Sequence, residues 1–158
     1  MPKKSAGILP YRVRDGRLEV LLVHPGGPFW ARRDDGAWSI AKGEHADDEA
    51  PLAAAIREFA EETGRVPPGP FVPLPPQKQP GGKTIAAWIT ADDWDPAAFV
   101  SNTFTLEWPR GSGRLATFPE VDRVAWFDLP TAARKLLRGQ LPFLAALERL
   151  VPQPQPTP

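Results

Sequence analysis

The sequence predicts an α/β fold in which helices pack on a mixed β-sheet. Strand-like apolar runs occur at residues 5–13, 18–24, 38–41, 84–90, 101–108 and 123–127. Helical patterns occur at residues 47–64, 131–137 and 141–151. One strong helix thus lies between strands and more helix follows at the end, an order typical of a sheet covered by helices.

Length and composition narrow the class of protein further. With 158 residues, we expect a single domain over residues 1–151 and a proline-rich tail, without a core to join, at residues 152–158. Nineteen basic residues balance nineteen acidic ones, so bulk charge does not indicate a nucleic-acid polymer or a membrane as partner. The chain has no cysteine and two histidines, which excludes disulfides, a thiolate zinc site and a multi-histidine metal site. No apolar run approaches the roughly 20 residues of a membrane helix, and we expect a cytoplasmic location.

Turns and prolines define the elements between the helices. Asp15 and Gly16 predict a hairpin turn between the first two strands. Pro10 lies inside the first strand, which predicts an edge position or a bulge there. Seven prolines within residues 67–80 predict a rigid, extended connector.

The segment 47–64 is the clearest helix. Acidic residues open it, which suits the helix dipole and predicts capping of the first amides. Pro51 falls in its first turn, and Gly64 predicts a left-handed end. Four residues at helical spacing form the face that packs on the sheet: Leu52, Ile56, Phe59 and Thr63.

Three carboxylates occupy a neighbouring arc of this helix. Glu58, Glu61 and Glu62 repel one another and lie in the half of the helix that disfavours anions. Arg57 offsets part of that repulsion. By helix physics alone, a solvated acidic stripe and a divalent-cation site, for which oxygen ligands suit Mg²⁺ or Mn²⁺, are equally good interpretations.

The wider spacing favours the cation. The pattern G-x5-E-x7-R-E-U-x-E-E-x-G, with U a bulky apolar residue, is met by Gly43, Glu49, Arg57, Glu58, Phe59, Glu61, Glu62 and Gly64. A chance match is on the order of one in a million for this composition. The segment resembles the Nudix box. It departs from the family at Arg65, where the pattern has an apolar residue that Val66 would supply one position late.

The resemblance implies a Nudix-type α/β/α sandwich and hydrolysis of a nucleoside diphosphate linked to another group. It implies that Glu58, Glu61 and Glu62 bind Mg²⁺ or Mn²⁺, together with a carbonyl from Lys42. The remaining box positions have supporting roles: Arg57 holds the helix glutamates, Gly43 allows a sharp loop, and Glu49 supports the loop–helix junction or the metal site. Glu49 as a plain helix N-terminal acid is the alternative.

The general base is left open between two acids. One is Glu58 in the box, and the other is Glu120, which precedes the strand at 123–127 and matches a position from which a family loop acid approaches the metals. A solvated loop acid is an equally weighted alternative for Glu120.

Loops supply the candidate substrate contacts. Aromatic and basic groups suited to stacking a base and holding phosphates are Phe29, Trp30, Arg32, Lys78 and Lys83. An ordinary surface loop is the alternative in each case. The loops at residues 23–30 and 118–122 also resemble, more weakly, the branch of the family that hydrolyses diadenosine tetraphosphate and nucleotides.

We therefore expect a pyrophosphohydrolase whose partner is a small nucleotide, a dinucleoside polyphosphate or a nucleoside triphosphate. Two alternatives remain: a sanitising hydrolase of damaged nucleoside triphosphates, and a nucleotide-binding module without catalysis. The intact set of carboxylates argues against the second. The sequence leaves the substrate and the oligomeric state open.

Overall fold

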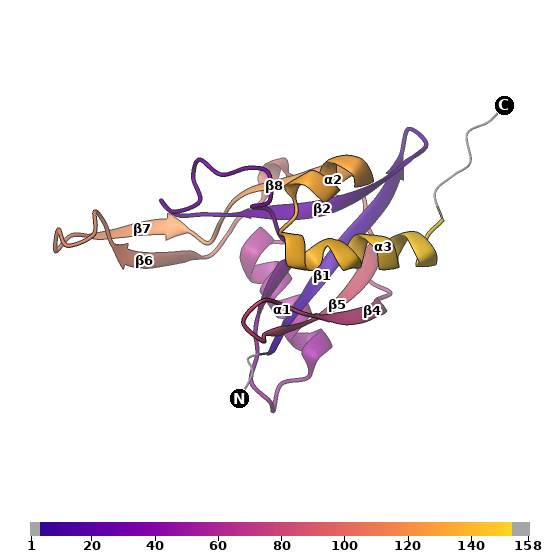
Figure 1. The fold of residues 1–158 in the computed structure, drawn as a ribbon, viewed down its shortest axis with the longest axis horizontal. Helices are drawn as coiled ribbons and strands as arrows, with labels where there is room; N and C mark the ends of the chain where they lie inside the picture. The colour runs from indigo at the N-terminus through magenta and orange to yellow at the C-terminus, as the bar shows by residue number, and fades with distance from the viewer. Residues whose placement is uncertain (1–3, 153–158) are drawn as a thin grey trace.

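The computed structural model describes residues 4–152, and its centre is a mixed β-sheet with the strand order β4-β5-β1-β2-β8 (Figure 1). The strands of this sheet are β1 (Lys4–Arg14), β2 (Arg17–Pro25), β3 (Ala41–Glu44), β4 (Val72–Lys78), β5 (Thr84–Ala91) and β8 (Val121–Asp128). β1 runs parallel to β5, whereas β1–β2, β1–β3, β2–β8 and β4–β5 are antiparallel. Asp15 and Gly16 both have positive φ in the β1–β2 turn, as their sequence predicts.

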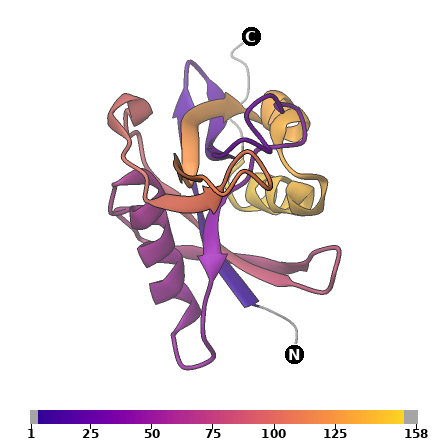
Figure 2. The same ribbon diagram turned by 90° about the vertical axis from the view of Figure 1, so that its left-hand side faces the viewer.

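Helices cover both faces of the sheet. α1 (Pro51–Thr63) lies on one face, and α2 (Leu129–Lys135) and α3 (Leu141–Leu150) lie on the other (Figure 2). Phe59 of α1 packs in one apolar cluster with Ile8, and Phe143 of α3 packs in the other with Leu9. Neighbouring residues of β1 thus face opposite layers, which is the α/β/α sandwich that the sequence predicts. Short 3₁₀ turns occur at η1 (Pro96–Ala98) and η2 (Arg138–Gln140).

A separate hairpin projects from the body of the molecule. It consists of β6 (Thr103–Glu107) and β7 (Leu115–Pro119), which form a two-stranded sheet of their own (Figure 1). β6 was expected within 101–108, but β7 was not. The turn end of this hairpin meets the loop after β2, where the rings of Phe29 and Trp108 lie edge to face at 5.3 Å.

Two proline predictions were wrong. Residues 72–78 are not a connector but the edge strand β4, which tolerates proline because the register shifts between Leu74 and Gln77, across Pro75 and Pro76. Pro10 lies in a central strand, not at an edge. It falls where β1 changes partner, from β3 at residues 5–8 to β2 at residues 11–14, so its missing amide hydrogen interrupts neither ladder.

The start of the long helix also differs from the prediction. α1 begins at Pro51, and its N-cap Ala50 is extended and has no side-chain cap, so residues 47–49 belong to the preceding turn. The cause is Pro51 itself, because a proline disfavours helical geometry in the residue before it. The expected strand at 38–41 is displaced to β3, and Trp38 and Ser39 make isolated bridges instead. Gly64 ends α1 in the left-handed conformation, as expected.

Candidate active site

The acidic arc of α1 faces strand β3. A Cβ added to Gly43 would overlap the Glu58 carboxyl group, so glycine leaves room for that carboxylate where it stands. Gly43 has no left-handed φ, and the expectation that it allows a sharp loop was therefore wrong. It is glycine because Glu58 packs directly over its backbone.

Glu62 is the most perturbed acid of the arc. Its Oε2 accepts a hydrogen bond from the backbone N–H of Lys42 at 3.1 Å. Burial, and then the charge of Glu58, raise the pKa of Glu62 to about 8. The charge of Lys42 opposes this rise, and the charge of Glu120 adds a smaller one. The pKa of Glu58 is also raised, chiefly by burial. Three acids from α1 and the segment before β8 therefore share a region that is short of positive charge.

Arg57 gathers the remaining box acids. Its Nε and Nη2 each donate to Glu49 at 3.0 Å, in a two-pronged pair. Its Nη1 donates to Glu58 at 3.0 Å and lies 3.3 Å from Glu61. Glu49 precedes the helix and thus joins the loop to α1 through Arg57, as the first of its expected roles requires.

Glu120 is held beside α1 by backbone hydrogen bonds. The N–H of Asn102 donates to the carbonyl of Glu61, and the carbonyl of Asn102 accepts from the N–H of Glu120, both at 2.8 Å. The N–H of Gly26 donates to the Glu120 carbonyl at 2.9 Å. Nothing in the sequence indicates these links, because peptide groups make them and their residue types leave no pattern.

A pocket of about 190 Å³ opens at this place. Four predicted site residues line it: Trp30, Lys42, Glu62 and Glu120. The other walls include Ser39 and Ile40, which the buried amide of Gln140 holds by hydrogen bonds. An aromatic ring, a lysine and two carboxylates thus share one cavity.

The other predicted substrate residues lie around this pocket at varying distance. Phe29 is 60% exposed and points to the β6–β7 hairpin rather than into the pocket. Lys83 donates to Glu44 at 3.1 Å and is close enough to Lys42 to lower its pKa, after the larger effect of burial. Arg32 and Lys78 are exposed and do not line the pocket.

The residues fit a hard divalent cation in their chemistry. Their donor atoms are carboxylate oxygens, and the raised pKa of Glu62 reflects the cost of burying its negative charge. Within residues 4–152, no three acidic or histidine side chains converge as they stand in a metal-binding arrangement. Glu58 and Glu61 instead receive positive charge from Arg57. The assignment of metal ligands stays a prediction.

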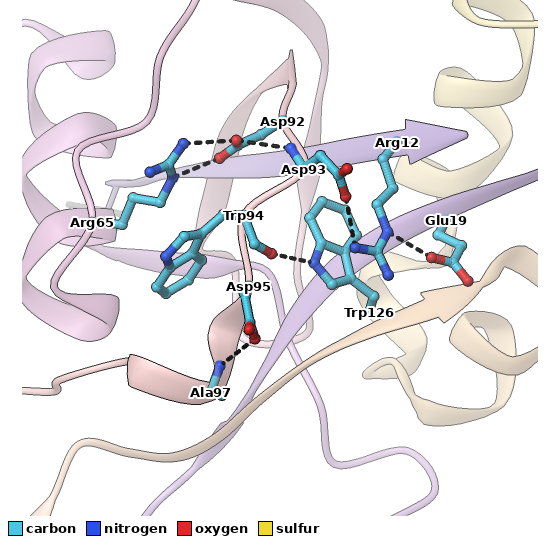
Figure 3. Close-up of polar contacts among 9 residues, drawn as sticks. All are labelled: Arg12, Glu19, Arg65, Asp92, Asp93, Trp94, Asp95, Ala97 and Trp126. Atoms are coloured by element: carbon cyan, nitrogen blue, oxygen red, sulfur yellow. Dashed lines mark hydrogen bonds and ion pairs between the residues drawn. The ribbon is translucent and has the colours of Figure 1, made fainter. Parts of the chain in front are cut away.

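The end of α1 is fixed by a second arginine. Arg65, at the position where the box has an apolar residue, forms a two-pronged pair with Asp92 at 2.8 Å for both bonds (Figure 3). Its guanidinium also lies 5.7 Å from the ring centre of Trp94. Val66 is 71% exposed, so the expectation that it replaces the apolar contact was wrong. An ion pair beside an aromatic ring takes that place.

Comparison with known proteins decides the family. The model of the NUDIX domain matches residues 1–147. The chain belongs to the Nudix family. Nudix proteins are pyrophosphohydrolases, so the predicted enzyme class is confirmed, and this chain is a Nudix hydrolase acting on nucleotide derivatives. Nudix hydrolases generally use divalent cations.

Solved structures share the Nudix fold at low sequence identity. The Nudix domain of Shewanella oneidensis NrtR complexed with ADP ribose is 20% identical, with a TM-score of 0.65 over 96% of this chain and 90% of that one. A C. elegans Ap4A hydrolase is 19% identical, with a TM-score of 0.63 over 94% and 96%. NrtR has also been solved with a 27mer DNA, at 20% identity and a TM-score of 0.59 over 92% of this chain and 61% of that one.

None of the helices that lie within residues 4–152 is both long and apolar enough to cross a membrane. The proline-rich tail expected at 152–158 lies, from residue 153 on, outside the described residues.

Proposed function

We propose that this Nudix hydrolase cleaves a phosphoanhydride of a dinucleoside polyphosphate, and that Glu58, Glu61, Glu62 and the Lys42 carbonyl hold the Mg²⁺ or Mn²⁺ that the reaction needs. The supporting observation is the pocket in which Glu62, Glu120, Lys42 and Trp30 meet. It joins two carboxylates to a lysine and an aromatic ring, the groups that a metal–phosphate chain and a base require. When bound, the ion neutralises charge on the bridging phosphates.

The size of the pocket supports a long substrate. Sites that enclose a whole small ligand have volumes of roughly 300–1,000 Å³. This pocket, at about 190 Å³, suits one base and its nearest phosphates and leaves the rest of the substrate outside. Next to Trp30, Phe29 presents a second, exposed aromatic ring against Trp108. That pair would stack the second base of a dinucleoside polyphosphate, which a nucleoside triphosphate does not have.

The chain's own residues divide the work. Trp30 stacks the first base, and Lys42 and Lys83 offer positive charge to the phosphates. Arg57 fixes Glu58 and Glu61 from the side. Glu120 takes the proton of the attacking water, because it lines the pocket while Glu58 already accepts a hydrogen bond from Arg57.

A substrate panel tests the proposal. Dinucleoside polyphosphates and normal and oxidised nucleoside triphosphates are incubated with the protein in ¹⁸O-labelled water, with Mg²⁺, with Mn²⁺ and with chelator. We expect metal-dependent release of nucleoside phosphates, fastest from the dinucleoside compounds. Faster turnover of oxidised triphosphates would identify a sanitising hydrolase, and tight binding without turnover in excess Mn²⁺ would overturn the proposed catalysis.

Two variants separate base from metal ligand. Glu120→Gln should lower kcat about 100-fold or more and leave the half-saturating Mn²⁺ concentration unchanged, as expected for a lost general base. Glu58→Gln should raise that concentration. If the two results were exchanged, Glu58 would be the base.

The remaining expectations are part of the same proposal. A single domain over residues 1–151, a cytoplasmic location and a small nucleotide rather than a nucleic-acid polymer as ligand stay predictions. A DNA-binding assay of the whole chain tests the last of these.

A further inference from the structure

His24 is a fully buried side chain near the end of β2 that the proposed reaction does not use. Its Nδ1 lies 2.7 Å from Asp122 Oδ1, and its Nε2 lies 2.6 Å from the carbonyl oxygen of Arg33. A carboxylate and a carbonyl accept hydrogen bonds and donate none. Both contacts are therefore hydrogen bonds only when each ring nitrogen carries a hydrogen, which makes the ring an imidazolium.

The surrounding charges favour the proton on the ring rather than on Asp122. A carboxylic acid is a stronger acid than imidazolium. The Asp122 side chain is 29% exposed, so water reaches its charge, and Arg123 Nε lies 3.6 Å from the same oxygen. Solvent water and the Arg123 guanidinium both stabilise the carboxylate form of Asp122.

The other charged groups near the ring have contacts of their own. His24 meets the ring of Trp38 edge to face at 5.2 Å, and the Trp38 indole N–H donates to Asp34 at 2.8 Å. Lys135 of α2 in turn pairs with Asp34 and Asp35. Arg33 approaches the ring with its carbonyl, while its guanidinium lies 5.5 Å from the ring centre of Trp30.

The two hydrogen bonds of His24 join the walls of the substrate pocket. On one side, the N–H of Arg33 donates to the carbonyl of Trp30 at 2.9 Å, so His24 is connected to Trp30 through one residue. On the other side, Asp122 lies two residues after Glu120 in the same chain segment. Trp30 and Glu120 both line the pocket.

We propose that His24 and Asp122 are positioning residues whose ion pair ties the loop of residues 26–36 to β8 and so keeps Trp30 opposite Glu120. The roles of Trp30 and Glu120 rest on the proposed function, whereas the tie itself does not. Glu120 is held to α1 independently of this loop, through the backbone of Asn102. Loss of the tie therefore moves the loop and affects KM more than kcat.

The tie has a distinctive dependence on protonation. If the imidazolium loses one of its two N–H protons, one ring nitrogen no longer donates a hydrogen bond to Asp122 or to the Arg33 carbonyl. That side of the tie is then lost, and the loop is released. Asp122→Asn behaves differently, because its amide donates to Nδ1 of a neutral ring whose Nε2–H still reaches Arg33. This variant keeps the tie without any charge.

Nuclear magnetic resonance tests the protonation directly, without need of turnover. The chain has two histidines, and His45→Gln leaves His24 as the only imidazole in a ¹⁵N-labelled sample. We expect both ring nitrogens of His24 to be protonated at neutral pH, and one of them in Asp122→Asn. A neutral His24 ring in the protein with Asp122 intact would overturn the proposal.

Kinetics test the positioning on the best substrate of the panel. In Asp122→Ala the tie is broken, and we expect KM to rise about tenfold, the effect of one charge-assisted hydrogen bond, with kcat within about threefold. KM of Asp122→Asn should stay within about twofold of the wild-type value, because its amide keeps the tie. An unchanged KM in Asp122→Ala would overturn the positioning role. If no nucleotide is hydrolysed at all, the proposed function fails, while the resonance experiment still decides whether the tie exists.

Discussion

Two arginines at α1 bind carboxylates in opposite ways. Arg57 faces Glu49, Glu58 and Glu61 at once, and the neighbouring Glu62 has a pKa raised to about 8. Arg65 faces Asp92 alone, in a two-pronged pair. The group around Arg57 has more acids than bases and borders the pocket, so we call it the unbalanced group. Arg65 and Asp92 match one positive charge with one negative charge, and we call them the balanced pair. Excess negative charge thus distinguishes the side of α1 that is suited to bind a cation from the ion pair after its end, which only stabilises the fold.

Removing a carboxylate from the unbalanced group should have the largest effect. Glu62→Gln keeps the size of the side chain and an acceptor for Lys42 N–H but loses the charge. We expect kcat to fall about 1,000-fold, as for the loss of a metal ligand. Steady-state kinetics check this, with Glu148→Gln on the exposed side of α3 as the matched control, expected within twofold. If Glu62→Gln kept the wild-type kcat, Glu62 would not be a metal ligand in the reaction.

Crowding the same group should have the next largest effect. In Gly43→Ala the new methyl meets the Glu58 carboxyl, which must move, and a displacement of about 1 Å at a reacting centre can cost about 100-fold in rate. A double-mutant cycle measures whether Glu58 mediates the loss. In a Glu58→Ala background, Gly43→Ala should cost almost nothing further. An undiminished second loss would mean that Gly43 acts through the backbone.

Breaking the balanced pair should affect stability instead. Arg65→Leu restores the apolar residue of the family pattern but leaves Asp92, whose side chain is 6% exposed, without its guanidinium. We expect the free energy of unfolding to fall by about 3 kcal/mol, measured by urea denaturation. The kcat of the folded protein should stay within about twofold. A large loss of kcat with normal stability would show that the two groups are not independent.

The smallest expected effect is a gain of stability in the unbalanced group. The folded state holds the Glu62 proton more tightly than the unfolded chain does, so the wild type loses stability as pH rises from about 4.5 to about 8. Glu62→Gln does not titrate. With chelator present, we expect Glu62→Gln to be more stable than the wild type at pH 8 and almost equally stable at pH 4.5. Equal pH profiles in urea denaturation would contradict the raised pKa.

The sequence predicts the acidic arc well because helical periodicity and a fixed spacing place Glu58, Glu61 and Glu62 together without reference to the rest of the fold. It misjudges Gly43, because the contact that excludes a side chain there comes from an element that is fifteen residues away. In the sequence, Arg65 is only a departure from the apolar residue of the Nudix box. The structure explains the arginine by its contacts with Asp92 and Trp94. His24 and Asp122 are 98 residues apart, and only the pairing of β2 with β8 brings them into contact.

The two backbone hydrogen bonds of Asn102 form a strut between α1 and Glu120. This strut determines which sequence changes the site tolerates at this position. It connects Glu61 to Glu120 by one peptide N–H and one carbonyl, and its side chain takes no part in either bond. Almost any residue type is therefore acceptable at this position, proline excepted, since proline lacks the donor. The N–H of Val100 also donates to the carbonyl of Thr63 at 2.9 Å, so two positions of this segment are in register with α1. One residue inserted between 100 and 102 would break that register and displace Glu120 relative to the helix.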